Sequence, residues 1–236
     1  MNLKNILYLD IETVGTTQKY QQLPERLQHL WDKKSLQFLK KDDDDPATLF
    51  EQKAGIFAEF GKIICISVAY FKDDKLRITS FANENEYQLL KDFADMLNKY
   101  FANFQLCAHN GKEFDFPYIC RRMLINGLKL PDILNIQGKK PWETTFVDTL
   151  ELWKFGDYKH YTSLDLLSAI FDIPSPKDDI DGSQVHEVYW TSHDLNRIKT
   201  YCEKDVLTIV QLMLRYEGKD ILTDDKIVYV NITENS

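Results

Sequence analysis

Two acids, Asp10 and Glu12, stand in an apolar run, ILYLDIET, whose composition is otherwise that of a buried strand. Successive side chains of a strand point to opposite faces, so both carboxylates share one face about 6.6 Å apart, with Ile11 turned away. Burying ionised carboxylates is costly unless a partner offsets the cost, and a divalent cation is one such partner. Oxygen donors of this kind suit Mg²⁺ or Mn²⁺. The pair alone is equally consistent with a strand end whose acids are hydrated.

A tyrosine and another acid, Tyr201 and Asp205, are four residues apart in a segment with helical periodicity. Residues at this spacing lie one turn apart on the same helix face, so both side chains can serve one site. A further acid, Asp115, begins a helix after the strand-like segment FQLCAHN, at the carboxyl end of a strand, where open α/β sheets place their ligand sites. The helix that carries Tyr201 and Asp205 also has apolar residues that would press it onto the sheet: Leu195, Ile198, Cys202, Ile209, Val210 and Met213.

Strands that precede helices along the chain predict an α/β fold that positions these acids. We predict a first strand over 5–11 and a hairpin formed by GKIICISVAYF and KLRITSFA. A helix after Phe114 has Pro117 in its first turn and Gly127 at its C-terminal end. The pattern also predicts helices over 84–101, 162–171 and 192–216, the last with Ser192 as N-cap, and a strand within 226–233.

The segment between the first two strands, 16–60, is too long for a hairpin loop and contains two helical patterns around the charge run KKDDDDP. We interpret it as a helical insertion in a single domain that spans 1–236, with 218–236 as a C-terminal tail. The aspartates at 42–45 are interpreted as a solvated linker.

Composition and charge limit the classes of function. The 44% of hydrophobic residues are ordinary for a globular protein, and no apolar run approaches the roughly 20 residues of a membrane span. No signal-peptide pattern is present, so we expect a soluble cytoplasmic protein. A net charge of −8 argues against a protein that coats DNA but not against an enzyme whose site is built of acids. The scattered cysteines are predicted to be core thiols: Cys65, Cys107, Cys120 and Cys202.

Three motifs in this order, LDIET, HNGKEFDFPYI and YCEKDV, resemble the exonuclease motifs of the DEDD superfamily of 3′→5′ exonucleases. The resemblance implies an RNase H-like fold, with a central mixed sheet flanked by helices. The chain is similar in particular to stand-alone bacterial relatives of the proofreading exonuclease domain of family B DNA polymerases. Tyr-x-x-x-Asp in the last motif is typical of the DEDDy subgroup, whereas the histidine subgroup has a histidine where this chain has Thr200. The similarity covers most of the chain outside 16–60 and the tail.

The resemblance also implies a role for each matching acid. Asp10, Glu12 and Asp205 would hold one Mg²⁺ or Mn²⁺ ion. Asp10 would bridge to a second ion, which Asp115 would hold through water. Tyr201 would orient the attacking water, and this two-metal hydrolysis would release nucleoside 5′-monophosphates.

Substrate contacts follow from the same resemblance. Thr13, Asn110 and Phe114 would touch the terminal nucleotides of a single-stranded nucleic acid 3′ end. Phe114 would either stack on a base or pack in the core. Lys112 is either a phosphate contact or a solvated turn residue, and we favour the turn. Asp148 either supports the site or caps the next helix, and we favour the cap.

Several interpretations of the activity stay open. Our leading hypothesis is an exonuclease on single-stranded DNA, with DNA favoured as partner and a replication or repair protein acting in trans. An RNase D-like exoribonuclease would use the same chemistry, and no residue pattern separates the two substrates. A non-catalytic module that binds nucleic-acid ends is disfavoured because all five expected site residues are present. The segment DDIDG is rejected as a calcium loop because Lys177 would be its first ligand. His186 and His193 are predicted to lie on the surface.

Overall fold

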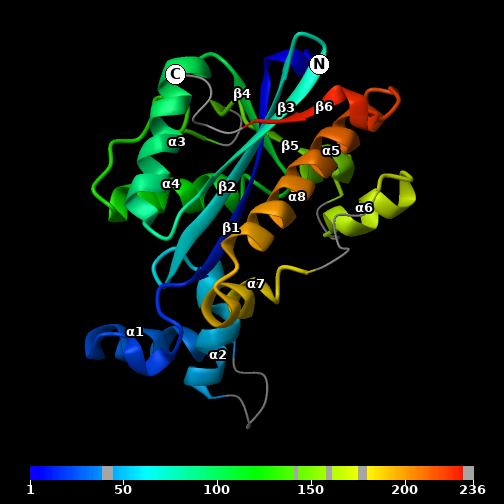
Figure 1. Cartoon of the computed structure of the whole chain (residues 1–236). Coiled ribbons are helices and arrows are strands. Elements are labelled where there is room, and N and C mark those ends of the chain that lie inside the picture. Colours follow the sequence, from blue (N-terminus) through cyan, green and yellow to red (C-terminus); the bar gives the residue numbers. More distant parts are fainter. Residues whose placement is uncertain (39–44, 141–142, 158–160, 175–179, 231–236) are drawn as a thin grey trace.

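The computed structural model describes residues 1–38, 45–140, 143–157, 161–174 and 180–230. Its centre is a six-stranded mixed sheet with the strand order β5-β4-β1-β2-β3-β6 (Figure 1). The central strand, β1, pairs antiparallel with β2 and parallel with β4, and the edge strands β5 and β6 both pair parallel with their neighbours. The strands are β1 (Ile6–Gly15), β2 (Gly61–Lys72), β3 (Lys75–Ala82), β4 (Gln105–Ala108), β5 (Val147–Asp148) and β6 (Ile227–Tyr229).

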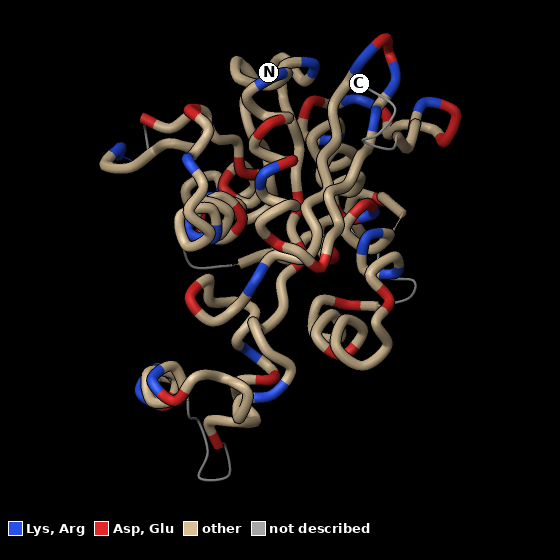
Figure 2. Tube along the Cα trace, turned by 60° about the vertical axis from the view of Figure 1, so that its left-hand side comes forward, with Lys and Arg blue, Asp and Glu red and all other residues tan. Residues whose placement is uncertain are grey.

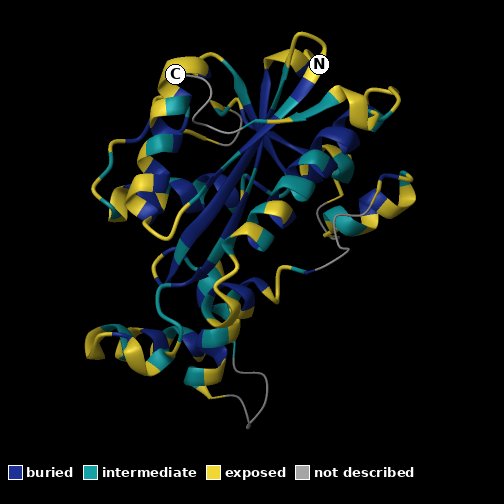
Figure 3. Cartoon of the chain, in the orientation of Figure 1, coloured by how far each residue is buried: buried dark blue, intermediate teal, exposed yellow. Residues whose placement is uncertain are grey.

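Helices cover both faces of this sheet, so the predicted α/β fold is confirmed. Helices α3 and α4 pack on one face, and the long helix α8 crosses the other (Figure 1). Burial is concentrated in the strands between these helices, as Figure 3 shows. The helices are α1 (Glu25–Ser35), α2 (Pro46–Lys53), α3 (Glu86–Tyr100), α4 (Asp115–Ile125), α5 (Thr149–Lys154), α6 (Leu164–Ile170), α7 (Val185–Glu187) and α8 (Leu195–Tyr216).

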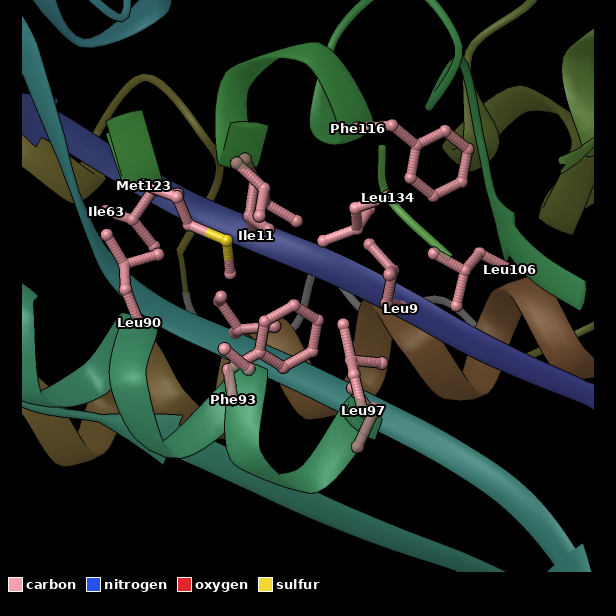
Figure 4. Close-up of a cluster of buried hydrophobic side chains, with 14 of the residues drawn as sticks. Leu9, Ile11, Ile63, Leu90, Phe93, Leu97, Leu106, Phe116, Met123 and Leu134 are labelled. Carbon is pink, nitrogen blue, oxygen red and sulfur yellow. The ribbon is translucent and has the colours of Figure 1, made fainter. Parts of the chain in front are cut away.

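The larger core lies between the sheet and helices α3 and α4 (Figure 4). Leu9 and Ile11 of β1 point into it, where they meet Leu90 and Phe93 of α3 and Phe116 of α4. Because strand side chains alternate, Asp10 and Glu12 must face the opposite side, which α8 covers. The acids therefore share the α8 face of β1 with Ile6 and Tyr8, which pack against apolar residues of α8.

The first strand is longer than the sequence predicts. It continues to Gly15 and pairs with β2 as far as Gly61, after a β-bulge between Glu12 and Thr13. The two acids therefore lie inside a paired strand, and the alternative of a hydrated strand end is wrong. A bulge next to a polar site is a common way to aim side chains, because the extra residue changes the local twist.

The start of α8 corrects the predicted N-cap. Asp194 caps the helix by accepting a hydrogen bond from the backbone N–H of Arg197, at 3.0 Å. Ser192 belongs instead to a π-helical turn, Val188–Ser192, which ends at His193 in the left-handed conformation with φ of 52°. This turn interrupts the helix that the sequence pattern extended to residue 192.

The segment between β1 and β2 contains helices α1 and α2, which lie beyond one end of the sheet (Figure 1). Their own apolar cluster centres on Trp31 and Phe50, whose rings meet edge to face at 5.3 Å. Residues 42–44 of the charge run lie outside the described residues. Asp45 is not a linker residue, because its carboxylate caps α2 through the backbone N–H groups of Ala47 and Thr48.

Other local predictions agree closely with the structure. The hairpin turn uses Asp73 and Asp74, both at positive φ, as tight two-residue turns require. Gly127 follows α4 with φ of +72°, and Ser163 caps α6. Of the predicted last strand, 227–229 forms β6, and 231–233 lies outside the described residues. No helix in the described part of the chain has the length and apolar character to cross a membrane.

Candidate active site

In the pairing of β1 with β2, Asp10 is opposite Ser67 and Glu12 is opposite Cys65. Glu12 is 7% exposed, and Asp10 is half-buried at the edge of the same site. No Lys or Arg side chain forms an ion pair with either acid in the part of the chain that the structure describes. Their negative charge therefore has no counter-charge from this part of the protein.

Helix α8 brings three polar side chains to these acids. Asp205 acts on the hydroxyl group of Tyr201 and raises its pKa, which places the two side chains next to each other, as their i, i+4 spacing predicts. Between them, Cys202 donates its thiol hydrogen to Asp10 Oδ2 and to the Asp10 carbonyl oxygen, each at 3.4 Å. One ligand atom each from Asp10, Glu12 and Cys202 lie within 4.8 Å of one another. These atoms are close enough to surround a single cation.

Asp115 is the first residue of α4 and is 4% exposed. Burial is the largest cause that raises the pKa of its carboxyl group to about 7, and the negative charges of Asp148 and Asp205 contribute to this rise. The backbone N–H groups of Asp115 itself and of Ile11 oppose it. Because Ile11 of β1 and Asp205 of α8 both act on this carboxyl group, residues from β1, α4 and α8 share one site.

The acids of β1 have pKa values well above their ordinary range. Burial is the largest cause for Asp10, followed by repulsion from Asp205, Glu12 and Asp115. For Glu12 the causes are burial, then Asp205, Cys65 and Asp115. The same negative charges, after burial, raise the pKa of Tyr201, so its hydroxyl group keeps its proton at neutral pH. Such a cluster of mutually repelling oxygen donors fits divalent cations, whose charge would relieve the repulsion.

The turn after β4 is held by Asp148. This carboxylate accepts hydrogen bonds from the backbone N–H groups of Asn110 at 2.9 Å and Lys112 at 3.0 Å. It also caps α5 through the N–H of Leu150 at 2.9 Å, which confirms the predicted cap. Asn110 takes a left-handed conformation, with φ of 59°. Lys112 lies in this turn, as predicted, and its ammonium group pairs with Glu151 at 2.6 Å.

The other predicted substrate contacts border the site in different ways. The hydroxyl group of Thr13 donates to the carbonyl oxygen of Gly55 at 2.8 Å, which joins β1 to the insertion. Phe114 is half-buried and its ring lies 5.3 Å from that of Tyr118, so it contributes to packing while one side stays open. Aromatic rings and backbone groups therefore border the acids and hydroxyl groups of the site.

Three smaller predictions need correction or limits. His186 is half-buried with Nε2 3.3 Å from the Gln18 carbonyl oxygen, so it is not a simple surface residue, and burial lowers its pKa. His193 is exposed, as predicted. Cys120 is half-buried, whereas the other three cysteines are buried. Of the segment DDIDG, 178–179 lies outside the described residues.

Sequence reasoning did not single out Cys202 as a site residue. It treated the side chain as one of the apolar positions of α8, and it is indeed fully buried. The available signal was its place three residues before Asp205, which puts both side chains on neighbouring positions of one helix face. Its contact with Asp10 spans 192 residues of sequence, and this long-range contact gives the thiol its role.

The fold is similar to part of a known polymerase. The structure is similar to that of the family B DNA polymerase from the hyperthermophilic archaeon Pyrobaculum calidifontis, with a TM-score of 0.56 and 16% identity. The match covers 89% of this chain but 24% of that chain, so this chain spans about a quarter of the polymerase. At this identity the similarity shows the fold alone.

The sequence comparison adds the family. Residues 56–228 match the family described as a predicted 3′-5′ exonuclease related to the exonuclease domain of PolB, and the chain belongs to this family. The matched range includes Asp115, Tyr201 and Asp205, and it begins after Asp10 and Glu12. No relative is found among curated proteins.

Proposed function

We propose that this chain is a metal-dependent 3′→5′ exonuclease that hydrolyses phosphodiester bonds at the 3′ ends of single-stranded DNA and releases nucleoside 5′-monophosphates. The main support is the convergence of acids from β1, α4 and α8 on one site in which burial and repulsion raise the pKa values of Asp10, Glu12 and Asp115. We further infer that residues 1–236 act as one exonuclease domain with 16–60 as its insertion, in the cytoplasm, in DNA repair or end-trimming.

In this proposal the acids hold two Mg²⁺ or Mn²⁺ ions. Asp10, Glu12 and Asp205 would bind the first ion, and Asp10 and Asp115 would bind the second. When bound, the ions would neutralise charge on the scissile phosphate and make an attacking water more acidic. Cys202 would fix the orientation of the Asp10 carboxylate through its thiol hydrogen bond.

Tyr201 would position the attacking water. Its hydroxyl group stays protonated and lies next to Asp205, so it can offer a hydrogen-bonding partner beside the acids. Preorganised polar groups of this kind lower the barrier because they need little rearrangement during the reaction. Tyr201→Phe would remove this partner and leave the ring packing in place.

The terminal nucleotides would lie against Thr13, Asn110 and Phe114. Since the Thr13 hydroxyl group is bonded to Gly55, we propose that its backbone makes the contact. The turn held by Asp148 would present the side chain of Asn110, and the open side of Phe114 would support a base.

A panel of 5′-labelled single- and double-stranded DNA and RNA oligonucleotides tests this proposal. We expect stepwise shortening of single-stranded DNA in Mn²⁺, no shortening in chelator, and 5′-monophosphates as products. Faster shortening of RNA would favour the exoribonuclease alternative, and binding without shortening would favour a non-catalytic module. Asp10→Asn should be inactive, whereas Asp95→Asn, at an exposed acid of α3 that pairs with Lys91, should match the parent.

A further inference from the structure

A cation lies against two aromatic rings close to the candidate active site. The ammonium group of Lys62 donates to the hydroxyl group of Tyr189 at 2.8 Å. It also lies 4.7 Å from the ring centroid of Tyr189 and 4.9 Å from that of Trp190. The two rings meet edge to face at 5.0 Å. We call these three residues the Lys62 cluster.

The Lys62 cluster lies on the same face of the sheet as the acids. Tyr189 packs in one apolar cluster with Tyr201 and Cys202, and Trp190 packs against it. In β2, Lys62 is paired with Val14, which stands two residues after Glu12 in β1, because of the bulge between Glu12 and Thr13. The offset from Glu12 along β1 is therefore about 6.6 Å. Phosphates of one nucleic-acid strand follow one another at spacings of about 3.4 Å or more along its axis, so a neighbouring phosphate falls within this range.

The charge of Lys62 is not neutralised by an acid. Lys62 forms no ion pair within the described ranges of the chain, although five other lysines pair with carboxylates: Lys4, Lys19, Lys91, Lys112 and Lys199. In a chain with a net charge of −8, a half-buried ammonium group without an acid partner is available for an external anion.

The aromatic partners hold this ammonium group in place. The π-helical turn Val188–Ser192 presents both rings, and such turns occur frequently at functional sites. The indole N–H of Trp190 is buried and has no acceptor among the described residues, so a hydrogen bond does not fix the ring. Its position comes from packing against Tyr189 and Lys62. The side chain of Lys62 is therefore ordered before an anion arrives, which lowers the entropy cost of binding.

Figure 2 shows that basic residues are spread over the surface and interspersed with acids. A broad basic face does not explain how this acidic protein would bind a polyanion. A single ordered cation beside the acids offers a local solution, because the bound metal ions and Lys62 would each contact a different phosphate.

We propose that the Lys62 cluster binds a backbone phosphate on the 5′ side of the scissile bond. Lys62 would bind the phosphate as a point charge, and Trp190 would offer ring surface to the adjoining sugar or base. This inference rests on the proposed exonuclease function. It adds a contact that matters for a strand with several phosphates and is irrelevant for a substrate whose only phosphate is the scissile one.

The test compares Lys62→Met with the parent on two substrates. This variant keeps most of the length of the side chain and removes its charge. For a thymidine decamer in Mn²⁺ we expect KM to rise about tenfold with little change in kcat. For the dinucleotide, whose single phosphate is the scissile one, both constants should match the parent. Lys99→Met is the matched control, because Lys99 also lies over a ring, 4.8 Å from Tyr100 on α3, away from the acids.

Binding gives an independent readout that needs no hydrolysis. Fluorescence anisotropy with a labelled decamer should show that Lys62→Met lowers the slope of log Kd against log salt by about 0.7, the value for one contact with a single strand. Equal slopes and equal KM values for Lys62→Met and the parent would overturn the proposal. An equal loss on the decamer and the dinucleotide would also overturn it. If the parent binds but hydrolyses neither substrate, the exonuclease proposal fails, and the binding slope alone decides the role of Lys62.

Discussion

Two groups of buried acids in this fold differ in what balances their charge. Glu86 at the start of α3 is 8% exposed and forms a two-pronged ion pair with Arg122 of α4, at 2.8 and 2.5 Å. It also accepts the backbone N–H of Ile63 at 2.7 Å. Glu12 is buried to a similar extent, at 7% exposed, and Asp10 is half-buried; neither forms an ion pair within the described residues, and both have raised pKa values instead.

The difference separates a structural charge from a charge that awaits a ligand. The pair of Glu86 and Arg122 joins α3, α4 and β2, and Arg122 also donates to the carbonyl oxygen of Ala58 in the insertion at 2.8 Å. Every part of this network comes from the chain itself. Asp10 and Glu12 instead form no ion pair with any described Lys or Arg, which explains why they are suited to bind divalent cations.

The largest expected effect is on activity. Asp10→Asn keeps the size of the side chain and removes one charge from the cluster, so we expect kcat in Mg²⁺ to fall by about 10³-fold or more, equivalent to roughly 4 kcal/mol. Without metal, the variant should be at least as stable as the parent because repulsion is relieved. A variant that shortens a labelled oligonucleotide at the parental rate would show that the assigned site is wrong.

A comparable effect on stability is expected at the paired acid. Arg122→Leu leaves Glu86 buried without its counter-charge, and we expect unfolding by urea to show a loss of about 3–5 kcal/mol. The double variant Glu86→Leu/Arg122→Leu should recover much of this loss, since no unpaired charge is left. If the single variant lost less than about 1 kcal/mol, the contrast between the two groups of acids would not hold.

The effect of metal on stability should distinguish the acids of the candidate site from the pair of Glu86 and Arg122. Excess Mn²⁺ should stabilise the parent by about 2.7 kcal/mol at a concentration 100 times its Kd, because the folded state alone forms the site. The gain should be much smaller for Asp10→Asn and unchanged in size for Glu86→Leu/Arg122→Leu. An unchanged melting temperature of the parent in Mn²⁺ would speak against a cation site.

The pH dependence of stability should change with metal. Since the pKa of Asp115 is about 7 in the folded state and 3.8 in the unfolded reference, the folded protein holds its proton more tightly. In chelator, stability should therefore be greatest below about pH 4 for this group and fall as the pH rises towards 7, by up to roughly 1.4 kcal/mol per pH unit for each proton. Asp115→Asn should flatten this slope in urea titrations at several pH values. A slope that is equal in both proteins would contradict the assignment.

The smallest effect is expected from the thiol. Cys202→Ala removes a hydrogen bond that lowers the pKa of Asp10, so the acid limb of the pH–rate profile should move to higher pH. The loss of this bond should lower the free energy of unfolding by about 0.5–1.5 kcal/mol. Cys202→Ser can still donate to Asp10 and should lie between the parent and the alanine variant. Cys120→Ser, at a half-buried thiol that donates to Leu134, is the control and should leave the profile in place.

Local patterns were enough to predict much of the fold and the central acids. Strand alternation placed Asp10 and Glu12 on one face, and helical spacing paired Tyr201 with Asp205. Two strand-like segments close together in the sequence predicted the hairpin that β2 and β3 form. These features depend on neighbours within one or two turns, which the sequence displays directly.

Features that depend on distant residues were not predictable from local patterns. The extension of β1 to Gly15 depends on its pairing with Gly61, and the role of Cys202 depends on Asp10. The contact between Lys62 and Tyr189 spans 127 residues. The π-helical turn before α8 replaced the expected cap at Ser192 because the chain turns there to pack both aromatic rings. Each of these features is set by tertiary packing, which overrides local preference.

Anomalous diffraction from a crystal soaked in Mn²⁺ tests the central claim most directly. The claim predicts a manganese peak between the carboxylates of Asp10, Glu12 and Asp205, with no peak at the ion pair of Glu86 and Arg122. A soaked crystal with no peak at the three carboxylates, or with these groups turned away from one another, would contradict it.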